Sequence, residues 1–321
     1  MSGTVVVVGS YNQDHVWSAD DLPEPGATRL GTYASGPGGK GFNQAVASAR
    51  AGARTSFVTA LGEDLAASHA FALAQAEGIT LLAQIHPDLP SGAAGIFVDA
   101  QGRNVIVVAA GANAALSPDF ILGQRERLET AAVVLAQLEV ATEAIASALR
   151  IANIAGAATI LNPAPANAPT TAGLLAQADI LTPNETEFAA LLERHADLQV
   201  DPDRLATMND AALQDLCRQL VRDGTVVITL GAAGVFVSHP SDNLRGDETS
   251  HYRMAGVPAR TVDTTGAGDA FSGALAAALA AVPKGRFRDA VAYANRYASR
   301  STERHGAALA MPYAADLAPA R

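Results

Sequence analysis

The chain has 321 residues, of which 49% are hydrophobic, and a formal net charge of −10. Its length and apolar content allow a large core, and a charged fraction of 17% is too low for a disordered protein. The negative charge argues against nucleic acid as a partner, and an anionic substrate would need a local positive site.

The N-terminal residues MSGTVVVVGS lack the basic region and the long apolar run of a signal peptide. No apolar segment free of charges and breakers is long enough to cross a bilayer, so we expect a cytoplasmic protein without a membrane partner. The single cysteine, Cys217, lies in a segment with helical spacing, which predicts a packed thiol rather than a nucleophile.

The first element is a strand over 4–8, a continuous β-branched run that predicts a fully buried parallel strand. Asn12 and Asp14 follow its carboxyl end, where ligands of open α/β sheets bind. Their donors and acceptors suit a sugar hydroxyl, although Asn and Asp are also common in ordinary polar turns.

A small β-rich lid is expected next, because prolines and glycines interrupt short strand-like pieces over residues 16–37. Residues 94–99 and 104–109 predict a hairpin around Gln101-Gly102. We expect the lid to comprise about 14–37 and 92–110 and to cover the main sheet of a single domain spanning 1–321.

The glycine-rich stretch at 36–43 formally matches G-x-G-x-x-G. No buried strand immediately precedes it, and Lys40 is followed by Gly rather than Ser or Thr, so neither a dinucleotide fingerprint nor a Walker A loop is predicted. A glycine loop at a helix start remains, where Lys40 and Asn43 can meet a polar ligand closely.

The rest of the chain alternates between strand-like and helix-like segments, which predicts an α/β fold with a mostly parallel, doubly wound sheet. Polar residues recur just after several strands and are expected to line one edge of the sheet. The strand-like runs are 55–60, 133–137, 158–161, 180–182 and 225–230, and the helix-like segments are 65–77, 118–128, 143–153, 185–192 and 210–222.

A second glycine-rich loop, Gly266-Ala267-Gly268, runs directly into an Ala/Leu-rich helix. Free N–H groups at such a helix start attract anions. Asp269 would repel an anion there, but it suits a base that takes a proton from an attacking hydroxyl while the N–H groups hold the moving charge. The ordinary alternative is an acidic residue in a first helical turn, favoured by the helix dipole.

Three motifs, at 38–45, Asn184-x-x-Glu187 and 263–269, occur in the order found in the ribokinase-like family of sugar kinases, and the resemblance covers residues 4 to about 312. Further stretches resemble the ribose-phosphorylating branch of that family: Asn12-x-Asp14-His15, 110–117, 137–139 and 162–166. The resemblance implies a large doubly wound, mostly parallel sheet with helices on both faces and a small β-sheet lid.

The implied activity is transfer of the ATP γ-phosphoryl group to O5 of D-ribose, with Mg²⁺ and a monovalent cation such as K⁺ as cofactors. Phosphorylation of another sugar or of a nucleoside is the alternative within the family. A non-catalytic sugar-binding regulator is a further alternative, although pure binding would not need the carboxylate of Asp269. A homodimer through the lid is expected, because a small isolated β layer has one face without a core.

The resemblance assigns roles by position. Asp269 is the general base, and Gly266, Ala267 and Gly268 form the anion hole. The sugar-binding residues are Asn12, Asp14, Gly39, Lys40, Gly41, Asn43 and Glu139. The residues bordering ATP are Asn184, Thr229, Leu230, Gly231, Ala232, Ala233, Gly234, Gly268 and Asn295. Glu187 acts on Mg²⁺ through water, and the monovalent-cation positions are Asp263, Thr265, Ser301, Arg304, Gly306 and Ala310, mostly through backbone oxygens.

Four positions depart from the family pattern without removing a group that the reaction needs. Ala109, Ala233 and Ala310 stand where His, Arg and Ser are frequent, respectively. Phe42 stands where a small residue is usual, and it either narrows the pocket or packs in the core.

Overall fold

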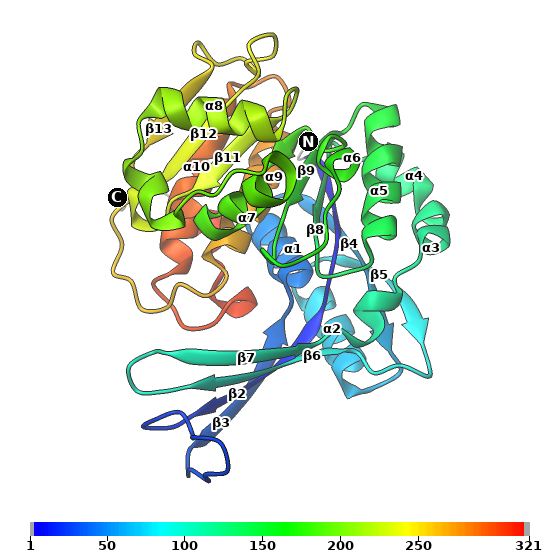
Figure 1. Ribbon diagram of the computed structural model, residues 1–321. Coiled ribbons are helices and arrows are strands. Elements are labelled where there is room, and N and C mark those ends of the chain that lie inside the picture. Colours follow the sequence, from blue (N-terminus) through cyan, green and yellow to red (C-terminus); the bar gives the residue numbers. More distant parts are fainter. Residues whose placement is uncertain (1–2, 318–321) are drawn as a thin grey trace.

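A computed structural model describes residues 3–317, and within that range the chain forms two separate sheets (Figure 1). The larger sheet has nine strands in the order β13-β12-β11-β10-β9-β8-β1-β4-β5, and its neighbours are parallel except in the two pairs that include β12. These strands are β1 (Thr4–Val8), β4 (Arg54–Gly62), β5 (Thr80–His86), β8 (Val133–Gln137), β9 (Ala158–Asn162), β10 (Ile180–Leu181), β11 (Thr225–Thr229), β12 (Val235–Ser238) and β13 (His251–Met254).

Helices cover both faces of this sheet, so its central strands are buried on both sides. Val5 and Val7 of β1 pack in the core that holds α1, α9 and α10, whereas Val6 and Val8 pack in the core that holds α5, α7 and α8. The helices are α1 (Lys40–Arg50), α2 (Leu65–Ala76), α3 (Pro118–Gly123), α4 (Arg125–Glu129), α5 (Thr142–Ala155), α6 (Ala172–Leu175), α7 (Glu185–Ala196), α8 (Asp210–Leu220), α9 (Ala267–Ala281) and α10 (Phe287–Ser301).

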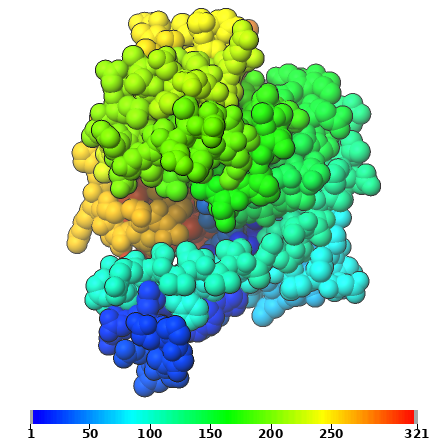
Figure 2. Space-filling view, viewed as in Figure 1, coloured from blue at the N-terminus to red at the C-terminus, as the bar shows by residue number. Residues whose placement is uncertain are grey.

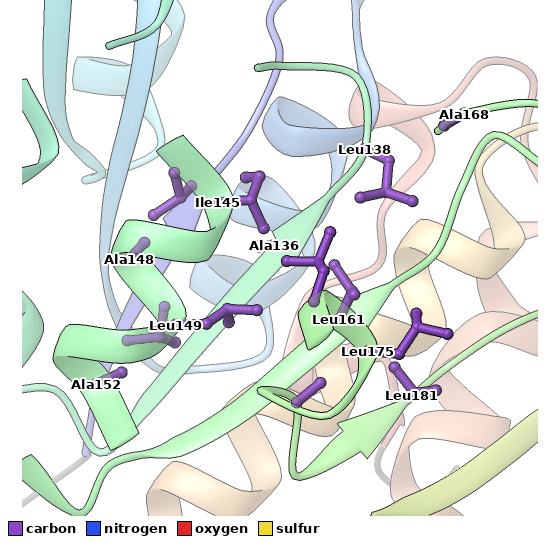
Figure 3. Packing of buried hydrophobic residues seen from close by; sticks show 14 of the residues in the cluster. Ala136, Leu138, Ile145, Ala148, Leu149, Ala152, Leu161, Ala168, Leu175 and Leu181 are labelled. Carbon is purple, nitrogen blue, oxygen red and sulfur yellow. The ribbon is translucent and has the colours of Figure 1, made fainter. Parts of the chain in front are cut away.

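Figure 3 shows the second of these cores, where one face of α5 lies over the sheet. Ile145 and Leu149 of α5 are fully buried in the same cluster as Ala136 of β8 and Leu161 of β9. Cys217 of α8 belongs to this cluster, and burial raises the pKa of its thiol to about 12. The prediction of a packed, unreactive thiol is therefore confirmed.

The smaller sheet projects from the body of the molecule and has the strand order β3-β2-β6-β7 (Figure 1). We call it the lid sheet. It begins directly after β1, so it is attached at the carboxyl end of that strand. Its strands are β2 (Asn12–Ser18), β3 (Thr32–Gly38), β6 (Gly92–Val98) and β7 (Asn104–Ala109). The predicted fold class, a large mostly parallel sheet with a small β lid, is confirmed.

Several elements differ from the prediction. The helix expected over 118–128 is two short helices, because the helix is interrupted at Gly123-Gln124 and glycine is a poor helix former. Strands β5, β12 and β13 and helix α10 were not predicted, because β5 is a half-buried edge strand and α10 carries many charged residues on its exposed face. The polar segment 239–250 connects the antiparallel strands β12 and β13. Over residues 3–317 we find no helix of the length and apolarity that a bilayer span requires.

Candidate active site

The site forms where the lid sheet joins the carboxyl end of β1, and the surface is hollowed between the lid sheet and the body of the molecule (Figure 2). Gly39, which precedes α1, has a φ of 85°, a conformation that L side chains rarely adopt. A Cβ added to Gly41 would lie 2.5 Å from the backbone N of Ser10, so glycine lets α1 approach the end of β1. The glycine loop therefore brings the start of α1 against the strand end that carries Asn12.

Two carboxylates, Asp14 and Glu139, share this corner of the site. Glu139 Oε2 accepts hydrogen bonds from Ser10 Oγ (2.6 Å) and from the backbone N of Lys40 (3.0 Å). Asp14 lies against Gly38, since a Cβ on that glycine would be 2.1 Å from Asp14 Oδ2. Burial, helped by the negative charge of Glu139, raises the pKa of Asp14 to about 7. The charged form of Asp14 is therefore disfavoured by its surroundings.

Asp269 is buried in the first turn of α9, with 6% of its surface exposed. Asn43 Nδ2 donates to its Oδ2 (2.9 Å), and Gln44 Nε2 donates to its Oδ1 (2.9 Å). Burial raises the pKa of Asp269, while the charge of Lys40 and these two hydrogen bonds act in the opposite direction. Helices α1 and α9, far apart in the sequence, therefore meet at this carboxylate.

Two polar groups of α1 complete this part of the site. Asn43 is 6% exposed, and its Oδ1 has no hydrogen-bond partner within the described residues, so it can accept from a ligand hydroxyl. Burial acts to lower the pKa of Lys40, but the charges of Asp269, Glu139 and Glu187 outweigh it and raise that pKa. Lys40 therefore places a positive charge within electrostatic reach of these three carboxylates.

The start of α9 has the features expected of an anion site. Gly266, at the N-cap, has a φ of 75° and makes no side-chain cap, so the first-turn N–H groups are not covered by a side chain. A Cβ on Gly268 would meet nothing within 4 Å, which leaves the space over this turn open. The N–H of Ala267 differs from the expectation, because it donates to the carbonyl oxygen of Thr264 (3.2 Å) in a turn.

Asn184 and Glu187 form a capping box at the start of α7. Asn184 Oδ1 accepts from the N of Glu187 (2.8 Å), and Glu187 Oε2 accepts from the N of Asn184 (2.9 Å). Burial raises the pKa of Glu187 and the charge of Asp269 adds to this, whereas the bond from Asn184 and the charge of Lys40 oppose it. The Asn-x-x-Glu motif thus has a structural role, and it also places a buried carboxylate within electrostatic reach of Asp269.

The segment predicted to border the nucleotide lies beside this motif. Thr229, at the end of β11, forms a parallel bridge with Asn184. The turn that follows contains Gly231 and Gly234, both with positive φ, and a Cβ on Gly234 would lie 2.1 Å from the carbonyl oxygen of Met254. Asn295 of α10 is mostly buried and donates to the carbonyl oxygen of Ala255 (2.8 Å).

Asp263 joins two loops near the start of α9. Its carboxylate accepts from the N of Thr265 (2.9 Å) and from the N of Gly306 (2.9 Å). Burial acts to raise the pKa of Asp263, but these hydrogen bonds lower it overall. Of the other predicted cation positions, Ser301 donates its hydroxyl to the carbonyl oxygen of Ala298, the Arg304 side chain is exposed, and Ala310 is buried.

Comparison with known proteins identifies the family of this chain. Residues 2–314 match the protein family described as "pfkB family carbohydrate kinase". The chain belongs to the pfkB family of carbohydrate kinases. It is 34% identical over 319 residues to a ribokinase of Staphylococcus aureus, with 97% of each chain covered. It is 36% identical over 311 residues to a bifunctional ribokinase/ribose-5-phosphate isomerase A of Fructilactobacillus sanfranciscensis, covering 96% of this chain and 54% of that protein.

A solved ribokinase of Arabidopsis thaliana, in complex with ribose and ATP, has the same fold as this pfkB family kinase. The TM-score is 0.82 with 28% sequence identity, and the similarity covers 99% of this chain and 98% of that one. The predicted resemblance to the ribokinase-like family is therefore confirmed. The similarity extends over essentially the whole chain.

Phe42 lies in the core of this family member and not in the pocket. It is 1% exposed and packs edge-on against Tyr11, with ring centroids 5.3 Å apart, and against Phe57 at 5.9 Å. Of the two alternatives raised by the sequence, burial in the core is the one observed.

Sequence reasoning missed Gln44 as a contact of Asp269. Gln44 directly follows Asn43 on α1, and both side chains reach the Asp269 carboxylate of α9. The pattern Asn-Gln at a helix start would have been a signal, because two adjacent amides are costly to bury without partners.

Proposed function

We propose that this protein transfers the γ-phosphoryl group of ATP to O5 of D-ribose. The observation that carries the proposal is the buried Asp269 carboxylate, placed at the open first turn of α9 and beside Asn43 and Lys40 of α1. Similarity to ribokinases, one of them solved with ribose and ATP, supports the choice of substrates.

In the proposed mechanism, Asp269 accepts the proton of the 5-hydroxyl group while the hydroxyl oxygen attacks the γ-phosphorus. The new O–P bond forms as the bond to the β,γ-bridging oxygen breaks, and ADP leaves. The backbone N–H groups of Gly266, Ala267 and Gly268 and the charge of Lys40 hold the transferring phosphoryl oxygens. For Ala267 this requires that its N–H exchange the carbonyl of Thr264 for the ligand.

We propose that the sugar lies between the lid sheet and the start of α1. Asn43 Oδ1, which has no partner among residues 3–317, accepts from one hydroxyl, while Asp14 and Glu139 accept from others. Gly39 and Gly41 let the sugar approach the backbone. The full set of proposed sugar contacts is Asn12, Asp14, Gly39, Lys40, Gly41, Asn43 and Glu139.

We propose that the nucleotide occupies the neighbouring loops, where positive-φ glycines bring backbone groups close together. The proposed contacts are Asn184, Thr229, Leu230, Gly231, Ala232, Ala233, Gly234, Gly268 and Asn295. Within the described residues no group of three or more His, Cys, Asp or Glu side chains could cage a metal. Mg²⁺ fits nevertheless, because it keeps several waters, and the capping box uses only Oε2 of Glu187. When bound, Mg²⁺ would neutralise charge on the phosphate oxygens.

We propose that a monovalent cation, K⁺ rather than Na⁺, binds the loops that Asp263 joins, with Thr265, Ser301, Arg304, Gly306 and Ala310 lining the position mostly through backbone oxygens. The observation in favour is that Asp263 already connects this region to the loop that precedes α9. Initial rates in K⁺, Na⁺ and a large organic cation test this, and equal rates in all three would remove the proposal.

We propose a homodimer formed through the lid sheet, in the cytoplasm, where ATP is available. Apolar side chains lie exposed on both faces of the outer strand β7, with Ile106 51% and Val107 67% exposed, and β-strand neighbours point to opposite faces. Exposed Trp17 and Phe97 stack on each other next to this strand. An apolar patch of this kind on a soluble protein marks an interface.

A coupled assay of ADP release with ribose, 2-deoxyribose, fructose and a nucleoside tests the proposed function. A sugar that lacks one hydroxyl group leaves a buried polar group of the protein without a hydrogen-bond partner, which costs about 1–3 kcal/mol. Such a sugar should therefore have a kcat/KM lower by up to roughly a hundredfold. D-Ribose should therefore be preferred. A tenfold preference for a nucleoside or a hexose would replace the substrate but keep the kinase, and binding without turnover of any of them would indicate a sugar-binding regulator.

A further inference from the structure

A buried chain of side-chain amides connects the large sheet to Asp269. Gln44, which is fully buried, donates from Nε2 to Asp269 Oδ1 (2.9 Å) and to Asn162 Oδ1 (3.0 Å). Its Oε1 accepts from Gln137 Nε2 (2.6 Å). Both N–H groups and the oxygen of the Gln44 amide are therefore engaged by the protein, and they are not available to a substrate.

The chain of hydrogen bonds continues along the carboxyl ends of the strands. Gln137 is the last residue of β8, and Asn162 is the last residue of β9. Asn162 Nδ2 donates to the carbonyl oxygen of Thr182 (2.8 Å), and the Thr182 hydroxyl lies 2.9 Å from the hydroxyl of Ser272 on α9. The network thus joins the ends of β8 and β9 and the residue after β10 to α9, the helix that carries Asp269. These elements are rigid, so they fix the position of the carboxylate.

Asn43 and Gln44 donate to different oxygens of the Asp269 carboxylate, and they differ in whether any of their own hydrogen-bonding groups remains free for a ligand. In the part of the chain that the structure describes, Asn43 Oδ1 has no hydrogen-bond partner, so Asn43 can also contact a ligand, whereas the Gln44 amide is fully used by Asp269, Asn162 and Gln137. Two donors on opposite carboxylate oxygens determine the plane of the carboxyl group. They use two of its roughly four acceptor positions, and the others stay free for a hydroxyl.

We propose that Gln44 is a positioning residue that holds the Asp269 carboxylate in the orientation and charge state required of the base. The proposal deepens the function proposed above and rests on the role of Asp269 in it. Gln44 acts through Asp269 without touching the sugar, so its loss should affect the chemical step more than binding.

The variant Gln44→Met, similar in length but without a donor, tests this role. A hydrogen bond to an ionised carboxylate lowers its pKa, so its removal should move the acidic limb of the pH profile of kcat upward by about one pH unit. We expect kcat at pH 7 to fall by about tenfold, with KM for sugar and ATP changing less than about threefold.

The matched control is Gln137→Met, which removes a buried hydrogen bond from Gln44 but none from Asp269. The melting temperature of Gln137→Met should fall about as much as that of Gln44→Met. The acidic limb of its pH profile of kcat should stay within about 0.3 pH units of wild type, because the Asp269 carboxylate keeps its hydrogen bonds from Asn43 and Gln44. A folded Gln44→Met protein with the wild-type limb, or an equal shift in the control, would overturn the proposal. If Gln44→Met does not fold, Gln44→Glu replaces it and should shift the limb in the same direction and further, since a second carboxyl group opposes ionisation.

A second readout needs no turnover. The ¹³C carboxyl resonance of Asp269, assigned by its loss in Asp269→Asn, can be titrated in the full-length unliganded protein. The pKa of Asp269 should lie about one unit higher in Gln44→Met than in wild type, and an unchanged pKa contradicts the positioning role. If that shift is found but the wild-type protein phosphorylates no sugar, the proposed function fails and the structural role of Gln44 stands.

Discussion

The two sheets use similar β-branched strands but stand in opposite surroundings. Val5 to Val8 of β1 are fully buried, because helices cover both faces of the large sheet. The run from Val105 to Val108 of β7 is at least half exposed at every residue. The large sheet therefore buries most of the apolar surface that stabilises the protein, whereas the lid sheet leaves apolar surface exposed, which is where we propose that a second copy binds. The residues of the site come from both.

The largest expected effect is on the free energy of unfolding, when one aromatic side chain is truncated in the large core and another in the lid sheet. Phe42→Ala removes a fully buried ring of the large core and should cost about 3–5 kcal/mol of unfolding free energy. Tyr33→Ala removes a ring of the lid sheet that is 56% exposed, and should change the unfolding free energy much less. Denaturant unfolding of both variants measures this, and equal losses would mean that the lid sheet has a core of its own.

The next largest effect is on turnover, at the site where the lid sheet meets the body of the molecule. Asp269→Asn preserves the shape of the side chain but removes the carboxylate that we propose as the base, so turnover should fall by about 10² or more. The fold and sugar binding should persist, as checked by melting temperature and calorimetric titration with ribose. Turnover close to wild type would exclude Asp269 as the base.

A charge on the lid sheet should dissociate the proposed dimer without destabilising the large sheet. Val107→Lys places an ammonium group in the exposed apolar strand β7, and we expect the dissociation constant of the dimer to rise at least about tenfold, since a buried charge without a partner is costly. The control is Leu122→Lys, at a comparably exposed position of α3. Light scattering at micromolar concentration reports the mass, and a wild-type protein that is an active monomer would contradict the interface.

The smallest effect is a pH dependence specific to the lid. The folded pKa of Asp14, about 7, lies above its ordinary value of 3.8, so the folded state binds the proton more tightly than the unfolded state. This group therefore favours folding at low pH, and that contribution is lost as pH rises through about 4 to 7. Asp14→Asn should melt at least about 2 °C above wild type at pH 8 and at the same temperature at pH 4, while it binds ribose less tightly. An equal difference at both pH values would argue against this titration.

The glycines show what sequence and structure each explain. Gly39 and Gly266 stand in glycine-rich stretches that the sequence places just before helices, and their positive φ angles give the physical reason for glycine there. The Asn-x-x-Glu motif was also recognisable, but its capping box emerged only in the structure. The inserted lid was predictable from the interrupted rhythm of the chain, whereas half-buried edge strand β5 lacks a clear periodic signal.

Local patterns in the sequence determined the α/β class, the small β lid and the place of Asp269 after a glycine loop, because each depends on neighbours within a few residues. Only the tertiary structure decided that Phe42 faces the core and that Gln44 reaches Asp269. The first depends on which face of α1 meets Tyr11 and Phe57, and the second joins residues 225 positions apart. Such contacts follow from how helices pack on the sheet, and no short window of sequence contains both partners.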